Sequence, residues 1–301
     1  MLVAAAASAV CLLLLAAVPA RLAGAPWVLR SPGLALLLWQ AIGLTAGILA
    51  LEVLTTVALA PAGSTHAAAV AAVLEGDLDR LPVWAGVALA AAALLLLHLL
   101  TVLLGSAAVT VRSRRVHRAL VDLVATRNPL LAGTQVVASD VPVAYCLPGL
   151  RPRVVLSRGA LSLLADDEIR AVLAHEEAHV AQRHDLVVLP FVALRATFPH
   201  LRVVRTAVAE VALLVEALAD DRAVRTHDRA VLARALYKVG AAGVPAGGLP
   251  VAGDGVLLRA QRLLDPPARL PLLTRLCVVG ATALVLLPVP LGLLLPLVAS
   301  R

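Results

Sequence analysis

The chain has 301 residues, of which 61% are hydrophobic, 2% aromatic and 15% charged, and its formal net charge is +7. This composition argues against an ordinary soluble protein and favours Ala-, Leu- and Val-rich helices that pack in lipid. Its basic residues are scattered among acids without a lysine tract or zinc-finger spacing, so we expect no direct binding of nucleic acid.

Four apolar stretches are long enough to cross a hydrocarbon core, which takes about 20 helical residues. They are Leu2–Ala20, Leu34–Ala60, Val83–Val111 and Leu276–Ala299. Between the third and the fourth, charged residues recur every few positions and short β-branched runs interrupt the helical periodicity. The sequence therefore predicts a mainly α membrane protein with three spans in residues 1–111, an aqueous α+β domain in 112–271, and a fourth span in 272–301.

The arginines of the short loops predict the orientation of these spans. Arg21 and Arg30 flank the first loop, acids dominate the second, and an arginine cluster at 112–118 follows the third span. By the positive-inside rule the first loop and the large domain are cytoplasmic and both termini lie outside. A cleaved signal peptide is disfavoured because the first stretch lacks a basic start. Two ionisable residues fall within spans, and we expect Glu52 to reach the outer interface rather than pair with His98.

The strongest motif is His175-Glu176-Glu177-Ala178-His179, an HExxH pattern. Acids at 166–168 mark the first turn of a helix, and apolar residues then recur at helical spacing. Two histidines one turn apart can reach one Zn²⁺, with Glu176 beside the metal as general base.

A third ligand is expected on a second predicted helix, 203–224. Glu216 and Asp220 are four residues apart within its apolar stripe, so one can bind the metal while the other accepts the ring N–H of a ligand histidine. Glu210 is the rival ligand, but it has no acidic partner four residues on. His184 lies about 180° round the first helix, and we expect it to decorate that helix's C-terminus.

Together these residues resemble the BlaR/MecR-type membrane metallopeptidases of bacteria, which are gluzincin-like. The resemblance covers roughly 142–224 and is carried by HExxH and the ExxAD-like residues 216–220. It implies one Zn²⁺ per chain on His175, His179 and Glu216, with Glu176 as base and Asp220 supporting a ligand. It also implies that a strand of Arg153, Val154, Val155, Leu156 and Ser157 is a sheet edge that holds an extended substrate, although an internal strand is equally compatible with the sequence.

The resemblance implies a multi-pass protease of the bacterial plasma membrane that cleaves a cytoplasmic transcriptional repressor or similar signalling target. HtpX-type quality-control peptidases carry the same residue pair and are the alternative; a non-enzymatic zinc-stabilised receptor or scaffold is a third hypothesis. We find no Ser-x-x-Lys motif, and the chain ends at Arg301. We therefore expect any β-lactam sensor to be a separate protein.

Overall fold

The structure is a computed structural model that describes all residues except 64, 77–81, 128–133, 148–152, 243–250 and 288–301. Its chain forms two compact units. Unit 1 comprises Met1–Leu104, Phe191–Glu210 and Leu270–Arg301, and unit 2 comprises Gly105–Pro190 and Val211–Arg269.

Helix α2 (Pro32–Leu59) is the centre of unit 1, where it packs against α1 (Leu2–Leu22) and α11 (Leu272–Leu286). Pro32 suits the first turn of α2 because its fixed φ is helical and its missing N–H is not needed there. Trp39 is 1% exposed, and the Thr45 hydroxyl donates to the Val285 carbonyl at 3.0 Å, joining α2 to α11. The unit also contains a short 3₁₀ turn η1 (Val28–Arg30) and α3 (His66–Leu74).

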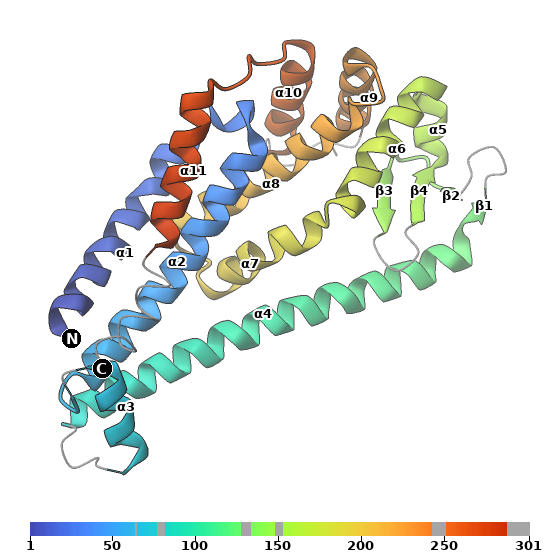
Figure 1. Ribbon diagram of the computed structural model, residues 1–301. Coiled ribbons are helices and arrows are strands. Elements are labelled where there is room, and N and C mark those ends of the chain that lie inside the picture. The colour runs from blue at the N-terminus through green and yellow to red at the C-terminus, as the bar shows by residue number, and fades with distance from the viewer. Residues whose placement is uncertain (64, 77–81, 128–133, 148–152, 243–250, 288–301) are drawn as a thin grey trace. The chain divides into compact units, whose positions relative to one another are not determined.

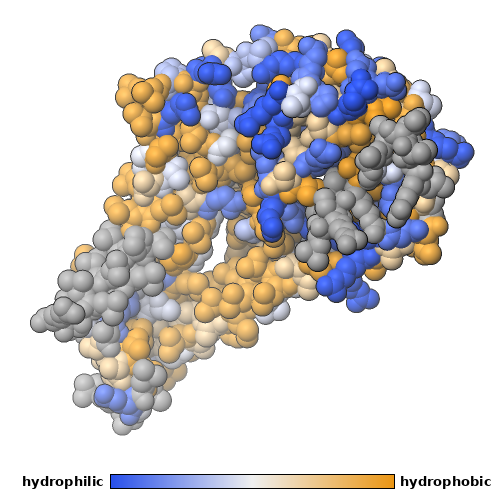
Figure 2. Space-filling view, turned by 45° about the vertical axis from the view of Figure 1, so that its right-hand side comes forward, coloured by the Kyte–Doolittle hydropathy of each residue, from blue (hydrophilic) through white to orange (hydrophobic). Residues whose placement is uncertain are grey.

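Three helices are long and apolar enough to cross a membrane: Ala5–Leu22, Pro32–Leu59 and Val83–Leu123. They overlap the first three predicted spans, and Figure 2 shows broad hydrophobic areas on the visible surface. Helix α4 (Val83–Val124) continues past the predicted end at Val111, because its arginine-rich continuation contains no helix breaker. Its 42 residues measure about 63 Å, roughly twice the hydrocarbon thickness. Helix α11 covers the first part of the predicted fourth span and ends at Leu286. The rest of that span, residues 288–299, lies outside the described part of the chain.

Part of the predicted inserted domain belongs to unit 1. The end of α7 (His184–Thr197) and the start of α8 (Arg202–Ala223) fall in Phe191–Glu210. A Cβ built on Gly43 of α2 would lie 3.9 Å from side-chain atoms of both Phe191 and Leu194. These two apolar side chains therefore pack against α2 at a position where α2 has no side chain of its own. The predicted bounds of 1–111, 112–271 and 272–301 separate membrane spans from an aqueous domain, not units of contact, and they stay a prediction.

Unit 2 contains a mixed four-stranded sheet of order β1-β2-β4-β3. Its strands are β1 (Thr126–Arg127), β2 (Thr134–Val137), β3 (Ala144–Leu147) and β4 (Arg153–Ser157). Strands β2 and β4 are parallel and the other pairs are antiparallel. Ser157 ends β4 and caps α5 (Arg158–Leu163), because its hydroxyl accepts the Ala160 N–H at 3.0 Å.

Helix α6 (Asp166–Ala181) packs between this sheet and two further helices, α9 (Arg229–Ala242) and α10 (Val251–Leu264), as Figure 1 shows. Ile169 and Val172 of α6 contact Leu156 of the sheet, whereas Ala171 belongs to a second cluster with Leu232 and Leu263. The HExxH segment is therefore on a helix that is buried along two faces, which suits a site that needs fixed side chains.

Candidate metal centre

Helix α6 places His175 and His179 one turn apart, on the face that the sequence predicts. Their Nε2 atoms are 3.2 Å apart. His175 is 3% exposed and His179 is half-buried, so both rings are held by surrounding packing. The predicted acids lie at the start of this helix, where the Glu168 carboxylate accepts the Ala165 N–H at 2.9 Å.

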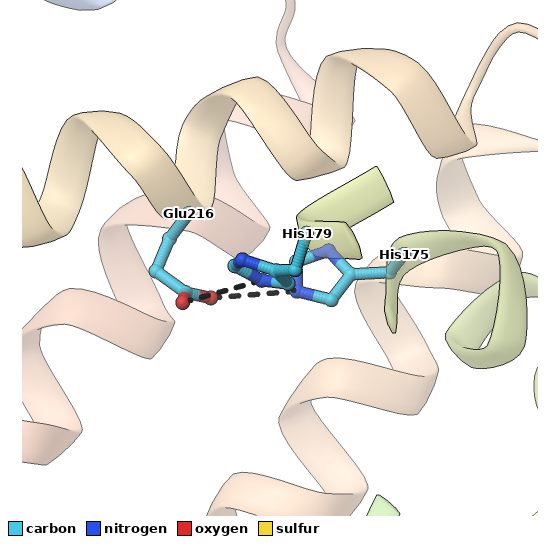
Figure 3. A group of neighbouring side chains, drawn as sticks. All are labelled: His175, His179 and Glu216. Carbon is cyan, nitrogen blue, oxygen red and sulfur yellow. Dashed lines mark hydrogen bonds and ion pairs between the residues drawn. The ribbon is translucent and has the colours of Figure 1, made fainter. Parts of the chain in front are cut away.

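Glu216 of α8 points its carboxylate at the two imidazoles (Figure 3). One oxygen lies 3.4 Å from His175 Nε2 and the other lies 3.5 Å from His179 Nε2. One ligand atom from each of the three residues can be chosen so that all lie within 4.8 Å of one another. A tetrahedral zinc site with bonds of about 2.0–2.1 Å separates its ligand atoms by about 3.3 Å, so the donor types and their spacing fit a zinc ion.

Asp220 supports the ring of His175 from the other side. It is 0% exposed, and its Oδ1 lies 2.9 Å from His175 Nδ1. A ligand histidine normally directs its second ring nitrogen to such an acceptor, which leaves the Nε2 lone pair facing the metal position. The structure therefore brings together the four residues that the sequence assigned to ligation and its support.

A buried arginine from α10 completes this network. Arg259 donates through Nε and Nη2 to the two Asp220 oxygens at 2.8 and 2.7 Å, and its Nη1 lies 2.7 Å from Glu216 Oε2. A guanidinium suits this position because its planar fork can engage two carboxylates at once. Arg259 thereby fixes both Asp220 oxygens and Glu216 Oε2, which also lies beside His175, and Glu216 Oε1 lies beside His179.

The charges in this network determine the protonation of each donor. Burial lowers the pKa of His175, but hydrogen bonds to Asp220 and Glu216 outweigh it and raise the pKa to about 9. Burial lowers the pKa of His179 to about 4. The pKa of Glu216 falls to about 2 despite burial, because His175 and Arg259 favour its ionised form. At neutral pH the centre thus presents an ionised carboxylate and a neutral His179, and metal binding must displace a proton from His175.

The comparison with protein families agrees with this geometry. Residues 110–242 match the family model described as Peptidase family M48. The match supports the M48 metallopeptidase family. It does not single out the BlaR/MecR type, and no curated protein and no solved structure matches the chain. The M48 match includes the HExxH motif, Glu216 and Asp220, and it ends before Arg259.

The matched segment 110–242 also contains Glu176, the predicted general base. It directly follows His175 on α6, is half-buried, and its charge acts on Arg259. The rival ligand Glu210 belongs to unit 1, where its carboxylate accepts the backbone N–H of Gly24. Glu216 rather than Glu210 is therefore the acid that meets the two histidines.

The prediction that residues 153–157 form a sheet edge is wrong. These residues form β4, but β4 pairs with β2 on one side and β3 on the other. Both rows of backbone groups of β4 are thus engaged, and the strand cannot take up a substrate. Among the described strands, β1 and β3 are the edges of this sheet.

The prediction for His184 is also wrong. His184 is 4% exposed, and its Nδ1 lies 2.9 Å from Nδ1 of His179. The expected C-terminal position assumed that a helix without glycine continues, but Arg183 adopts a left-handed φ of 49° and α7 begins at His184. The chain therefore turns back at Arg183 and returns His184 to the centre.

Sequence reasoning missed Arg259 because its contacts are distant along the chain. It lies 39 residues from Asp220. One signal was present: two acids on an apolar helix stripe require cationic partners, and Arg259 and Arg262 are three residues apart in an apolar segment. Both engage α8, since Arg262 lies 2.8 Å from Asp221.

Proposed function

We propose that this protein is a membrane-bound zinc-dependent endopeptidase with a regulatory role. The observation that supports the proposal most strongly is the convergence of His175, His179 and Glu216 from two helices, with Glu176 retained beside them. A zinc site that only joined two helices would need no general base. A Zn²⁺ ion bound there would supply a Lewis acid that polarises the scissile carbonyl and makes water more acidic.

The side chains of the centre divide the remaining work. Glu176 removes a proton from the attacking water and transfers it to the leaving amine. Asp220 holds the ring of His175, and Arg259 holds the carboxylates of Asp220 and Glu216. Because these groups are packed among α6, α8 and α10, they need little reorganisation during the reaction.

Its location in the membrane would restrict which substrates the enzyme meets. We place the peptidase domain in the cytoplasm of a bacterial cell, on the basis of the arginines in the first loop and after the third span. The substrates are then membrane-proximal chains or soluble proteins that dock at the inner surface. We propose a transcriptional repressor or a similar signalling protein as the target, with a separate sensor protein.

The test is a comparison of cleavage across the proteome in cells that express the full chain or its Glu176→Gln variant. The amide keeps the shape of the side chain but cannot take a proton, so specific cuts should fall by about 10²- to 10⁴-fold. Glu177→Gln is the matched control, because Glu177 is the next residue on the same helix and is exposed.

Each outcome of this comparison has a definite meaning. Loss of one or two cuts in Glu176→Gln alone supports regulatory proteolysis. Loss of many cuts supports the quality-control alternative. If the same cuts persist in Glu176→Gln, the enzymatic proposal is wrong, and a zinc-stabilised receptor or scaffold is favoured.

A further inference from the structure

A second imidazole lies behind the ligand candidate His179. His184 Nδ1 is 2.9 Å from His179 Nδ1, and the two rings meet edge to face with centroids 4.9 Å apart and an interplanar angle of 85°. His184 is 4% exposed, so water has little access to this contact. The two histidines of the centre are therefore backed differently, His175 by a carboxylate and His179 by another ring.

The direction of the hydrogen bond follows from the position of the metal site. Nε2 of His179 faces His175 and Glu216, and it must carry a lone pair in order to bind a metal. The proton of neutral His179 is then on Nδ1, which donates to Nδ1 of His184. His184 must accept there, so its own proton is on Nε2.

The backbone around His184 is built to hold this ring in place. The left-handed turn at Arg183 ends α6, and His184 is the first residue of α7. The next residue, Asp185, forms a 2.7 Å ion pair with Arg114 of α4 within the same unit. The left-handed φ at Arg183 sets the direction in which the chain leaves α6, and this direction brings the His184 ring to His179.

The second ring nitrogen of His184 supports a role beyond packing. His184 Nε2 is buried and has no hydrogen-bond partner among the described residues. A polar ring placed there leaves one buried ring nitrogen without a hydrogen bond, which destabilises the folded chain. An apolar side chain would avoid that cost, so the contact at Nδ1 is the feature that accounts for a histidine.

We propose that His184 is a positioning residue that accepts the Nδ1–H of His179 and thereby keeps Nε2 of His179 directed at the metal. This inference rests on the metal site of the proposed function. Acceptors of this kind change metal affinity by about 10- to 100-fold in other zinc sites, without touching the metal themselves. The sequence Arg183-His184-Asp185 thus supplies a turn, an acceptor and an anchor in consecutive residues.

The test compares His184→Asn with His184→Leu in the full chain, purified in detergent. Asparagine can place its Oδ1 near the position of the histidine Nδ1, whereas leucine has a similar size and no acceptor. The Zn²⁺ dissociation constant, measured by competition with a chelator, should rise about 10- to 100-fold in His184→Leu and less than about threefold in His184→Asn. His227→Leu controls for the loss of a histidine, since the described contact of His227 is with Thr226.

Two results would overturn the inference: wild-type affinity in His184→Leu, or equal weakening in the leucine and asparagine variants. Melting temperatures of the metal-free proteins show whether each variant folds, and His184→Met replaces the leucine variant if that one does not. If wild type itself binds no Zn²⁺, the proposed function fails as well. The two failures are therefore distinguishable.

Discussion

Units 1 and 2 are both built largely from helices and both bury hydroxyls, but among the described residues only unit 2 also buries ionisable side chains. Among the described residues, unit 1 buries the hydroxyls of Ser8, Thr45 and Thr56. Unit 2 buries the hydroxyls of Thr134 and Ser157 and, in addition, five ionisable side chains: Glu168, His175, His184, Asp220 and Arg259. Buried ionisable groups destabilise a fold unless they are paired, whereas a hydroxyl needs only a nearby carbonyl. The difference indicates that the fold of unit 2 depends on pairing among buried ionisable groups, four of which lie at the metal centre.

Removing Arg259 should have the largest effect on stability. Arg259→Met leaves the buried Asp220 carboxylate without its guanidinium, and loss of one partner of a buried pair costs about 3–5 kcal/mol. Unfolding of the detergent-solubilised chain by heat or denaturant measures the loss. Arg229→Met is the control, because Arg229 is exposed at the start of α9 and its replacement should change stability by no more than about 0.5 kcal/mol. Equal losses in both variants would contradict the account of a buried network.

Glu168 should give a smaller effect that depends on pH. Burial alone would raise the pKa of Glu168, but hydrogen bonds from Lys238 and Ala165 outweigh it and lower the pKa below its ordinary value of 4.5. Because the pKa is lower in the folded state, the stabilisation is complete above about pH 4.5 and is lost as pH falls through the folded-state pKa. Glu168→Gln should cost about 1.5–3 kcal/mol at neutral pH.

The measurement for Glu168 is the melting temperature of both proteins between pH 7 and pH 3. Wild type should lose its advantage over Glu168→Gln as the solution becomes acidic. An advantage that stays constant over this range would show that Lys238 and Ala165 do not stabilise the ionised form.

The sequence predicts the local parts of this site well. The acids at 166–168 mark the start of α6, the apolar stripe with Glu216 and Asp220 gives α8, and Arg153–Ser157 is a strand with the predicted bounds. The sequence-based predictions that were wrong or incomplete depend on contacts between distant parts of the chain, or on a single backbone angle. Pairing on both sides of β4 depends on strands elsewhere, the position of His184 depends on a φ of 49° at Arg183, and the partner of Asp220 is on α10.

In unit 1, removal of a buried hydroxyl should cost less than either change in unit 2. Thr45→Val deletes the hydrogen bond to the Val285 carbonyl and keeps the branched shape, so we expect a loss of about 1 kcal/mol without dependence on pH. Thr45→Ser keeps the hydroxyl and serves as the control. If Thr45→Val lost as much stability as Arg259→Met, buried hydroxyls in unit 1 would matter as much as buried ionisable groups in unit 2, and the comparison would fail.

The smallest effect should come from the ion pair of Arg114 and Asp185. Both side chains are partly exposed, with 29% and 22% of their surfaces accessible, and pairs of this kind contribute about 0–1 kcal/mol. A double-mutant cycle of Arg114→Gln and Asp185→Asn measures the coupling. A coupling free energy well above this range would contradict the prediction that this pair is a weak, partly exposed contact.

The most direct test of the account is the zinc content of the purified full chain, measured by atomic absorption. We predict one Zn²⁺ per chain in wild type and in Glu176→Gln, and loss of the metal in His175→Gln and Glu216→Gln, which remove two of its ligands. Wild type without stoichiometric zinc, or full zinc retention in both ligand variants, would contradict the claim that α6 and α8 hold one metal ion between them.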